Sequence, residues 1–388
     1  ILPLTHAFVE AAKEAGFAFT PDYNGRQQEG VAYSQMTRRG KWRGSTAQTF
    51  LREARGRSNL RVETEATVTR LLFDGRRCTG VAIRQRGADR QLTAGREVIL
   101  CGGAVNSPHV LQISGIGPAA HLQSIGVPVV HDLPGVGANL NDHYVIRLSH
   151  RVKNAVTINQ LARGARLARE VAKFFTAGNG ALTFGVTSAM VFCRSREGLA
   201  APDLQLLFTP ASYAQGVFRQ LEHEPGMTVA VCPVRPDSRG TIMAQSPDPF
   251  QYPAIRPNYL SAPSDIRVLS AGVAHTRRIF AQPAMASHSV GETVPGAGIA
   301  SDEQLADLAK KAGTNVFHPV GTCKMGTDPM AVVDPRLRVI GLTGLRVIDA
   351  SVMPCVTTGN TNAPTIMIGE KGAAMIKEDA RAQPARAA

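Results

Sequence analysis

Hydrophobic and polar positions alternate with two different periods along the first hundred residues. Phe8, Val9, Ala12 and Ala15 recur at helical spacing, and Gly16 follows them, which predicts an amphipathic helix that ends there. From residue 60 to residue 83 apolar and polar side chains alternate instead, with turn formers between the runs. This pattern predicts hairpins, so we expect a small antiparallel meander.

A continuous apolar run at 97–101 is typical of a strand that is buried on both faces of a parallel sheet. Gly102 and Gly103 follow it and allow a ligand to approach the main chain closely. Ser107 and Pro108 are expected to begin the next helix. A strand, two glycines and a helix start together predict a binding edge at the carboxyl end of the strand.

Residues from about 147 to 310 have a different character, because basic helices, Gly-rich loops and strands alternate there. We predict strands at 203–208 and 227–232 and helices at 161–175 and 261–280. A capping sequence at 301–304 predicts one more helix start. The residues from 20 to 45 are rich in turn formers and predict a surface loop with one short strand at most.

The stretch from 315 to 376 combines three features of a site for an anionic cofactor. His318 lies in a loop with Pro319 and Gly321, and Asp349 ends a short predicted strand. An apolar helix follows Pro364, which suits the first helical turn. The first-turn N–H groups and the positive end of the helix dipole can face an oxyanion.

Composition narrows the class of protein. The chain has 388 residues, of which 44% are hydrophobic and 19% charged, which is typical of a globular protein of more than one domain. The formal charge is +13, but the basic residues are scattered, so we expect a basic surface that tolerates anionic ligands or membrane lipid and no nucleic-acid binding. No run is long enough to span a bilayer, and six dispersed cysteines favour neither a metal site nor disulfides. We expect a soluble, cytoplasmic protein, with peripheral association at the inner membrane left open.

Three motifs of the chain, HPVGTCKMG, RVIDASVMP and GNTNAPTIMIGEK, together with GGAVNSPHVLQISGIG at 102–117, resemble the glucose–methanol–choline (GMC) family of FAD-dependent oxidoreductases. The resemblance implies a mixed α+β and α/β flavoprotein with two domains. Its expected parts are residues 1–146 and 311–388 for the FAD-binding domain and 147–310 for an inserted antiparallel-sheet domain that binds the substrate.

One feature of that family is missing from the sequence. No G-x-G-x-x-G follows a predicted strand, although this fingerprint marks the dinucleotide-binding unit that the family carries at its N-terminus. We therefore expect the chain to be part of a longer protein with a truncated FAD-binding domain. The isolated chain is expected to hold little FAD tightly.

The resemblance assigns roles to single residues. His318 is the expected catalytic base and Asn362 its hydrogen-bonding partner, although Asn362 could instead cap the helix. His143 is expected to be structural. Asp349 could be an ordinary turn residue and Val68 an ordinary core residue. The residues expected to contact FAD are Val68, Gly102, Ala104, Asp349, Ala350, Asn360, Pro364 and Thr365.

The resulting function is the oxidation of a primary alcohol to an aldehyde by hydride transfer to FAD, with a quinone, oxygen or another compound as electron acceptor. An aliphatic or other neutral alcohol is favoured, because a choline-type cation would require an aromatic cage or a placed carboxylate. Two alternatives remain at this point. One is a hydroxynitrile-lyase-type enzyme that uses flavin only structurally, and the other is a non-catalytic fragment without FAD.

Overall fold

The computed structural model of the chain describes residues 1–214, 220–296, 298–299 and 301–382, and two compact units are distinguished by their internal contacts. Unit 1 contains Ile1–Arg61, Tyr144–Val234 and Pro263–Thr314. Unit 2 contains Val62–His143, Arg235–Ala262 and the chain from Asn315 onward. Among the described residues, no helix combines the length and the apolar character that crossing a bilayer requires.

The unit boundaries differ from the expected division at two places. Residues 1–61 belong with the antiparallel sheet of unit 1, because β1 (Gly30–Tyr33) pairs with β11 (Ala189–Cys193) in antiparallel register. Residues 235–262 belong with unit 2, where the N–H of Leu140 donates to the carbonyl of Gly240 at 2.9 Å and the reverse bond measures 2.8 Å. Both differences result from strand pairing between residues about a hundred or more positions apart, which local patterns do not encode.

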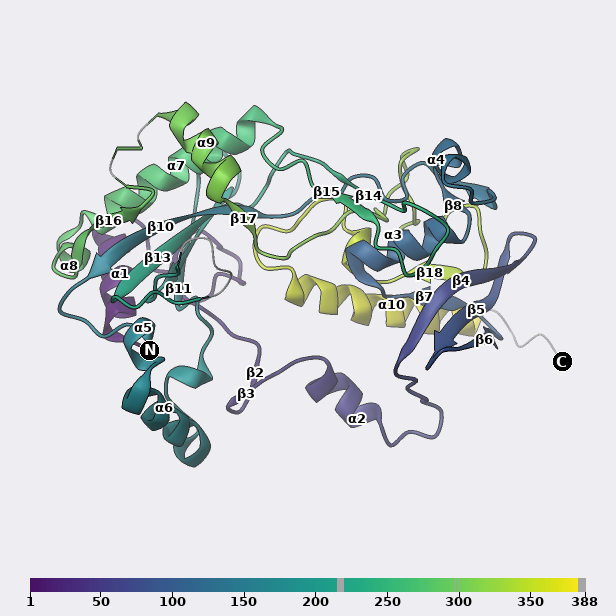
Figure 1. Ribbon diagram of the computed structural model, residues 1–388, viewed down its shortest axis with the longest axis horizontal. Helices are drawn as coiled ribbons and strands as arrows, with labels where there is room; N and C mark the ends of the chain where they lie inside the picture. The colour runs from purple at the N-terminus through teal and green to yellow at the C-terminus, as the bar shows by residue number, and fades with distance from the viewer. Residues whose placement is uncertain (215–219, 297, 300, 383–388) are drawn as a thin grey trace. The chain divides into compact units, whose positions relative to one another are not determined.

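Unit 1 is built on a mainly antiparallel sheet, against which α1 (Pro3–Glu14) and α7 (Pro263–Phe280) pack (Figure 1). The expected strands at 203–208 and 227–232 are present and pair with each other. Residues 30–33, which were expected in a surface loop, form β1 at the edge of the sheet. Phe8 of α1 stacks on Phe208 with ring centroids 4.2 Å apart in the core. In spatial order the strands are β1 (Gly30–Tyr33), β11 (Ala189–Cys193), β12 (Leu204–Thr209), β13 (Gly226–Pro233), β10 (Tyr144–Val152) and β16 (Ser289–Val294), and β17 (Thr314–Asn315) also pairs with β10.

The helices of unit 1 include the two long ones that the periodicity predicted, at 161–175 and 261–280. The capping box predicted at Ser301 is present, since its side chain accepts from the N–H of Gln304. A hairpin, β2 (Arg38–Arg39) with β3 (Trp42–Arg43), completes the unit. The helices are α1 (Pro3–Glu14), a π-helical turn η1 (Ala47–Leu51), α2 (Arg52–Ala54), α5 (Ile158–Leu161), α6 (Gly164–Ala177), the 3-10 turn η2 (Ala181–Thr183), α7 (Pro263–Phe280), α8 (Pro283–Ala286) and α9 (Asp302–Ala312).

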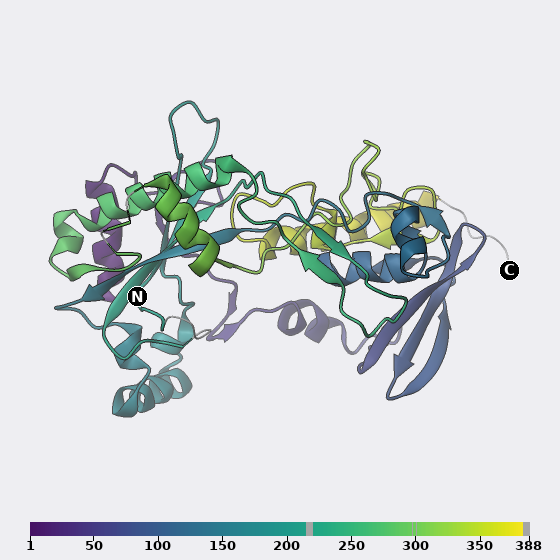
Figure 2. The same cartoon turned by 45° about the horizontal axis from the view of Figure 1, so that its top comes forward.

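Unit 2 contains the predicted antiparallel meander and a short parallel pair of strands. Figure 2 shows the meander strands β4, β5 and β6 side by side. The parallel pair joins β7 to β18, so the carboxyl ends of both strands lie at one edge. The elements are β4 (Ala66–Asp74), β5 (Arg77–Gln85), β6 (Ala88–Thr93), β7 (Val98–Leu100), α3 (Gly103–Ile113), β8 (Ile116–Gly117), α4 (Ala119–Ser124), β9 (His131–Asp132), β14 (Thr241–Met243), β15 (Ala254–Arg256), β18 (Leu345–Val347), the 3-10 turn η3 (Ala350–Val352) and α10 (Asn362–Ala382).

Strand β7 is less buried than its apolar sequence predicted. Leu100 is buried, but the Ile99 side chain between its neighbours is 40% exposed. Among the described residues β7 pairs only with β18, so one side of this strand lacks a partner strand. The expectation of burial on both faces was therefore wrong for this chain.

Helix α3 begins at Gly103, four residues before the predicted start at Ser107, and Pro108 lies inside it. Pro108 has no N–H, so the carbonyl of Ala104 loses its helical donor. The hydroxyl of Thr322 donates to that carbonyl instead, at 2.7 Å. This side-chain contact from a distant loop lets the helix run through its proline and connects the loop of His318 to α3.

Candidate active site

The loop that carries His318 is held through its main chain. Phe317 has a φ of +61°, which is uncommon for an aromatic residue, and Pro319 restricts the backbone of His318 on the other side. The N–H of His318 donates to Oδ1 of Asp142 at 2.9 Å. These constraints fix the direction in which the imidazole leaves the backbone.

Asp142 connects three parts of unit 2 through one buried carboxylate. Its Oδ1 accepts from the N–H groups of both His143 and His318, at 2.8 and 2.9 Å, and its Oδ2 accepts from the Tyr259 hydroxyl at 2.6 Å. Burial raises the pKa of this carboxyl, and the bonds from Tyr259 and the two N–H groups partly offset the rise. An ionised carboxylate is an acceptor only, which suits a position with three donors.

The two histidines form a direct contact, since Nδ1 of His143 lies 2.9 Å from Nδ1 of His318. The amide Nδ2 of Asn360 lies 3.4 Å from Nε2 of His318. An amide NH₂ is a donor, so in this arrangement Nε2 of His318 is the acceptor and its proton resides on Nδ1. His143 then accepts the Nδ1 proton, and the pair selects one tautomer of His318.

Burial lowers the pKa of His318 to about 4. The imidazole is therefore neutral at physiological pH, with the lone pair of Nε2 available to accept a proton. A general base requires this protonation state together with a position from which the proton can be reached. Asn360, whose amide lies beside Nε2, is itself exposed, so this nitrogen lies next to an accessible residue of unit 2.

Helix α10 begins at Asn362 itself, so this residue occupies the first helical position and does not cap the helix. Both the N–H and the hydroxyl of Thr365 donate to the carbonyl of Thr361, at 3.0 and 2.7 Å. Pro364 has no N–H. The first-turn donors that the helix leaves for a ligand are therefore those of Asn362 and Ala363, both exposed, and the N–H of Thr365 is not among them.

A second part of the candidate site lies at the carboxyl ends of β7 and β18. Asp349 accepts from the N–H of Gly103 at 2.9 Å and from the hydroxyl of Ser107 at 2.5 Å through Oδ2. Its Oδ1 accepts from the N–H of Ser351 at 2.8 Å. The side chain of Asp349 thus organises the glycine turn and the start of η3, where Ala350 lies, which agrees with the alternative that Asp349 is a turn residue.

The chain itself connects this edge to the histidine pair. Thr322 contacts the carbonyl of Ala104, and the N–H of Cys323 donates to the carbonyl of Ser351 at 2.9 Å. Thr322 lies four positions after His318, which limits their Cα separation to about 14 Å. Both parts therefore belong to one region of unit 2.

The glycine turn fits a cofactor that approaches the main chain. Gly103 has a φ of +73°, and no atom lies within 4 Å of the position that a Cβ would take. The same edge carries the start of α3, and a helix N-terminus favours negative charge. The open space beside Gly103 is consistent with a cofactor that passes close to the main chain.

Val68 lies in β4 opposite Ile83 and next to an irregularity in the strand register. It is half-buried. Its expected role at the adenine stays a prediction.

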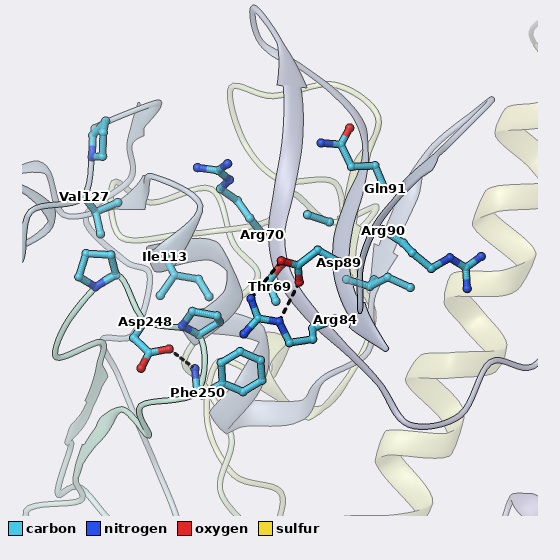
Figure 3. A pocket seen from close by; sticks show the side chains of 15 residues that line it. Thr69, Arg70, Arg84, Asp89, Arg90, Gln91, Ile113, Val127, Asp248 and Phe250 are labelled. Carbon is cyan, nitrogen blue, oxygen red and sulfur yellow. Dashed lines mark hydrogen bonds and ion pairs between the residues drawn. The ribbon is translucent and has the colours of Figure 1, made fainter. Parts of the chain in front are cut away.

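A separate hollow of about 550 Å³ lies beside the meander (Figure 3). Arg84 pairs with Asp89 at 2.8 and 3.1 Å there and lies over the ring of Phe250, 5.0 Å from its centroid. Thr69 lines the hollow, but none of the expected site residues does. The hollow is thus distinct from the cluster around His318.

Sequence patterns did not indicate that Asp142, His143 and Tyr259 would lie in the cluster around His318. The adjacent Asp-His pair at 142–143 was a weak signal, and His143 was interpreted as structural. No local pattern relates residue 142 to residue 318 or residue 259. Only the folded chain brings them together.

The chain is similar to known proteins over most of its length. Family models described as GMC oxidoreductase match residues 1–145 and 236–369. An alcohol dehydrogenase (acceptor) of Pseudomonas putida is 42% identical over 381 residues, which cover 96% of this chain and 68% of that protein. The mitochondrial choline dehydrogenase of Homo sapiens is 42% identical over 97% of this chain, and the match covers 63% of that protein, which is less than two thirds of its length.

Among solved structures, a variant of formate oxidase from Aspergillus oryzae RIB40, studied for its FAD modification, superposes with a TM-score of 0.90. The two sequences are 26% identical, and the match covers 97% of this chain and 70% of the other. This agreement confirms the expected fold class, a two-domain flavoprotein fold with an inserted antiparallel sheet. The family matches and the identity over nearly the whole chain show that this protein belongs to the GMC oxidoreductase family.

Proposed function

We propose that the protein oxidises a primary alcohol to the aldehyde, with Nε2 of His318 as the base that takes the hydroxyl proton. FAD is the cofactor of this family and, when bound, accepts the hydride that leaves the alcohol carbon. The proton and the hydride together account for the two hydrogens that the alcohol loses. His318 supplies a neutral imidazole whose Nε2 lone pair can accept the hydroxyl proton.

The observation that carries this proposal is the network around His318. A donor faces Nε2, so the ring nitrogen that can accept a proton is the one next to the exposed Asn360 amide. The His143 contact stabilises the tautomer with the proton on Nδ1. When Nε2 takes up the substrate proton, His143 still accepts from Nδ1, so the imidazolium is stabilised as well.

The two asparagines are proposed to hold the oxygen of the substrate. A neutral amide donates to a developing alkoxide without competing for its proton. We retain Asn362 in this role and add Asn360, whose amide already contacts His318. The other proposed cofactor contacts are those of Val68, Gly102, Ala104, Asp349, Ala350, Pro364 and Thr365, with Asp349 acting through the turn that it organises.

The substrate proposed is an aliphatic or other neutral primary alcohol, because the segment from 147 to 310 is poor in Trp and Tyr. We propose that the parts of this segment that belong to unit 1 supply most of the substrate-binding domain and that unit 2 binds most of the cofactor. The electron acceptor is proposed to be a quinone or oxygen. The proposed location is the cytoplasm, with peripheral association at the inner membrane.

Anaerobic reduction of the flavin in the holoprotein tests this proposal. Addition of a primary alcohol should bleach the flavin absorption in the native protein. The His318→Ala variant should keep its flavin and bleach about 10² to 10⁴ times more slowly. A native protein whose flavin stays oxidised in the presence of alcohol would instead support the lyase alternative, and a His318→Ala variant that bleaches at the native rate would remove the proposed base.

A further inference from the structure

Asn141 lies next to the carboxylate that holds the main chain of His318, and it is only 1% exposed. Its N–H donates to the carbonyl of Val320 at 3.1 Å, and its carbonyl accepts from the N–H of Val320 at 2.9 Å. These two reciprocal bonds form an antiparallel bridge. Val320 lies two positions after His318, so the bridge fixes the chain that leaves the histidine.

The side chain of Asn141 holds a second segment of unit 2. Its Oδ1 accepts from the N–H of Val356 at 2.9 Å. Val356 lies four positions before Asn360, whose Nδ2 lies 3.4 Å from Nε2 of His318. Both members of that contact are therefore connected to one buried residue, the histidine through the main-chain bridge and the asparagine through the Asn141 amide.

The NH₂ group of the same amide is also engaged. Nδ2 of Asn141 donates to the carbonyls of Pro236 and Ser238, at 3.3 and 3.2 Å. The position thus requires donors and an acceptor at once, which an amide provides and a carboxylate or an apolar side chain does not. A buried N–H or carbonyl that loses its partner is costly, so replacement of this amide should displace the segments that it joins.

Asn139 makes a similar set of contacts two positions earlier in the chain. Its Nδ2 donates to the carbonyls of Gly321 and Pro354, at 3.3 and 3.0 Å, and its Oδ1 accepts from Nε of Arg239 at 3.1 Å. Residues 139 and 141 therefore join the loop after His318 to the segment 354–356 at two successive points. All of these residues belong to unit 2.

We propose that Asn141 is a positioning residue that sets the separation between Nε2 of His318 and Nδ2 of Asn360. The inference rests on the proposed function, in which the first atom takes the hydroxyl proton and the second donates to the same oxygen. Asn141 acts through the main chain of both loops. A displacement near 1 Å of a reacting group can cost about 10²-fold in rate, so the connection matters for the chemical step.

Anaerobic bleaching of the holoprotein by a primary alcohol, followed by stopped-flow absorption, separates positioning from stability. Asn141→Leu removes the three side-chain bonds at nearly constant volume. The rate constant at saturating alcohol should fall about 10- to 100-fold, with the full amplitude per bound flavin. A role in stability alone would lower flavin loading or amplitude, while the remaining molecules would bleach at the native rate constant. Asn141→Ser keeps one hydroxyl and should give an intermediate rate constant, which is measured if the leucine variant does not bind flavin.

Asn159 of unit 1 offers a matched control. It is also fully buried, and its Nδ2 donates to the carbonyls of Ser212 and Glu222, at 2.9 and 3.1 Å. Its Oδ1 accepts from the N–H of Ser212 at 3.1 Å. Asn159→Leu thus removes bonds of the same kind and should keep the rate constant within about threefold of the native value, because none of them leads to the His318 loop.

A double variant tests whether Asn141 acts through His318. In the His318→Ala background, Asn141→Leu should slow bleaching by less than about threefold, because the base that it positions is already absent. Residues that act independently would instead show effects that multiply.

Three outcomes would overturn the positioning role and leave the proposed function in place. One is a native rate constant in Asn141→Leu or, where that variant binds no flavin, in Asn141→Ser. Another is an equal fall in the rate constants of the Asn141 and Asn159 variants. The third is a double variant in which the two effects multiply. A native holoprotein that alcohol does not bleach would overturn the proposed function and this role together.

Discussion

His318 in unit 2 and His150 in unit 1 show that a lowered pKa alone does not make an imidazole a candidate base. Burial lowers the pKa of both His318 in unit 2 and His150 in unit 1. His150 is enclosed: Nδ1 lies 2.8 Å from the Ser289 hydroxyl, Nε2 lies 3.9 Å from the Glu292 carboxylate, and the ring packs 4.1 Å from that of Phe280. His318 has the same protonation state but presents Nε2 to an exposed amide.

The difference is therefore one of access and orientation, because both rings are neutral near physiological pH. The carboxylate near His150 faces its ring and raises its pKa, opposing the larger effect of burial. The carboxylate near His318 contacts only its main chain, where it positions the residue without bonding to the ring. A lowered pKa alone would have selected both histidines, and the geometry selects one.

The largest effect is expected when the two histidines are replaced one at a time. His318→Gln should lower kcat for alcohol oxidation about 10² to 10⁴ times, because the amide cannot take up the hydroxyl proton. His150→Gln is the matched control and should leave kcat within about threefold, since its ring touches no proposed site residue. Steady-state kinetics of both variants check this, and equal losses would show that burial of a histidine matters in both places.

The next effect concerns the surroundings of His150. Arg277 makes two bonds to the buried carboxylate of Glu292, at 2.9 and 2.8 Å. Arg277→Ala leaves that charge without its main partner and should lower the free energy of unfolding by about 3 kcal/mol. Arg84→Ala, which breaks the exposed pair with Asp89, should lower the free energy of unfolding much less, because solvent screens exposed charges. Denaturant unfolding of both variants measures the difference, and a small loss in Arg277→Ala would contradict it.

A smaller effect is expected at the carboxylate that positions both histidine backbones. Asp142→Asn keeps the shape but replaces one acceptor oxygen with a donor, so one of its three donors loses its partner. We expect kcat to fall about tenfold, the equivalent of a loss near 1.4 kcal/mol. Tyr259→Phe removes a single donor and should have a weaker effect on the same rate. A full loss of activity in Asp142→Asn together with loss of the fold would assign the residue to stability alone.

The smallest effect is a dependence of stability on pH. The pKa of His318 is about 4 in the folded chain and near 6.5 when unfolded, so between these values only the unfolded chain takes up the proton. Stability from this group is therefore complete above pH 6.5 and is lost as the pH falls toward 4. Between pH 7 and about pH 5.7 the native protein should lose about 1 kcal/mol more than His318→Gln does, as measured by denaturant unfolding. Parallel losses in the two proteins would contradict the buried, neutral state.

The sequence determined the local elements and the chemical types at the site. Periodicity located the meander, the long helices of unit 1 and the helix that begins at Asn362, because side-chain period and backbone conformation are directly coupled. The motifs around His318, Asp349 and Asn362 indicated the family. These features are each contained within about a dozen consecutive residues.

The tertiary structure decided how these pieces meet. It placed residues 30–33 in the sheet of unit 1, and it let α3 start at Gly103 because Thr322 satisfies the carbonyl that Pro108 leaves free. It also brought Asp142 and His143 to His318 across about 175 positions, and Asn360 to Nε2 of the same ring. Contacts of this kind depend on burial and on the pairing of distant segments, so no local pattern could have specified them.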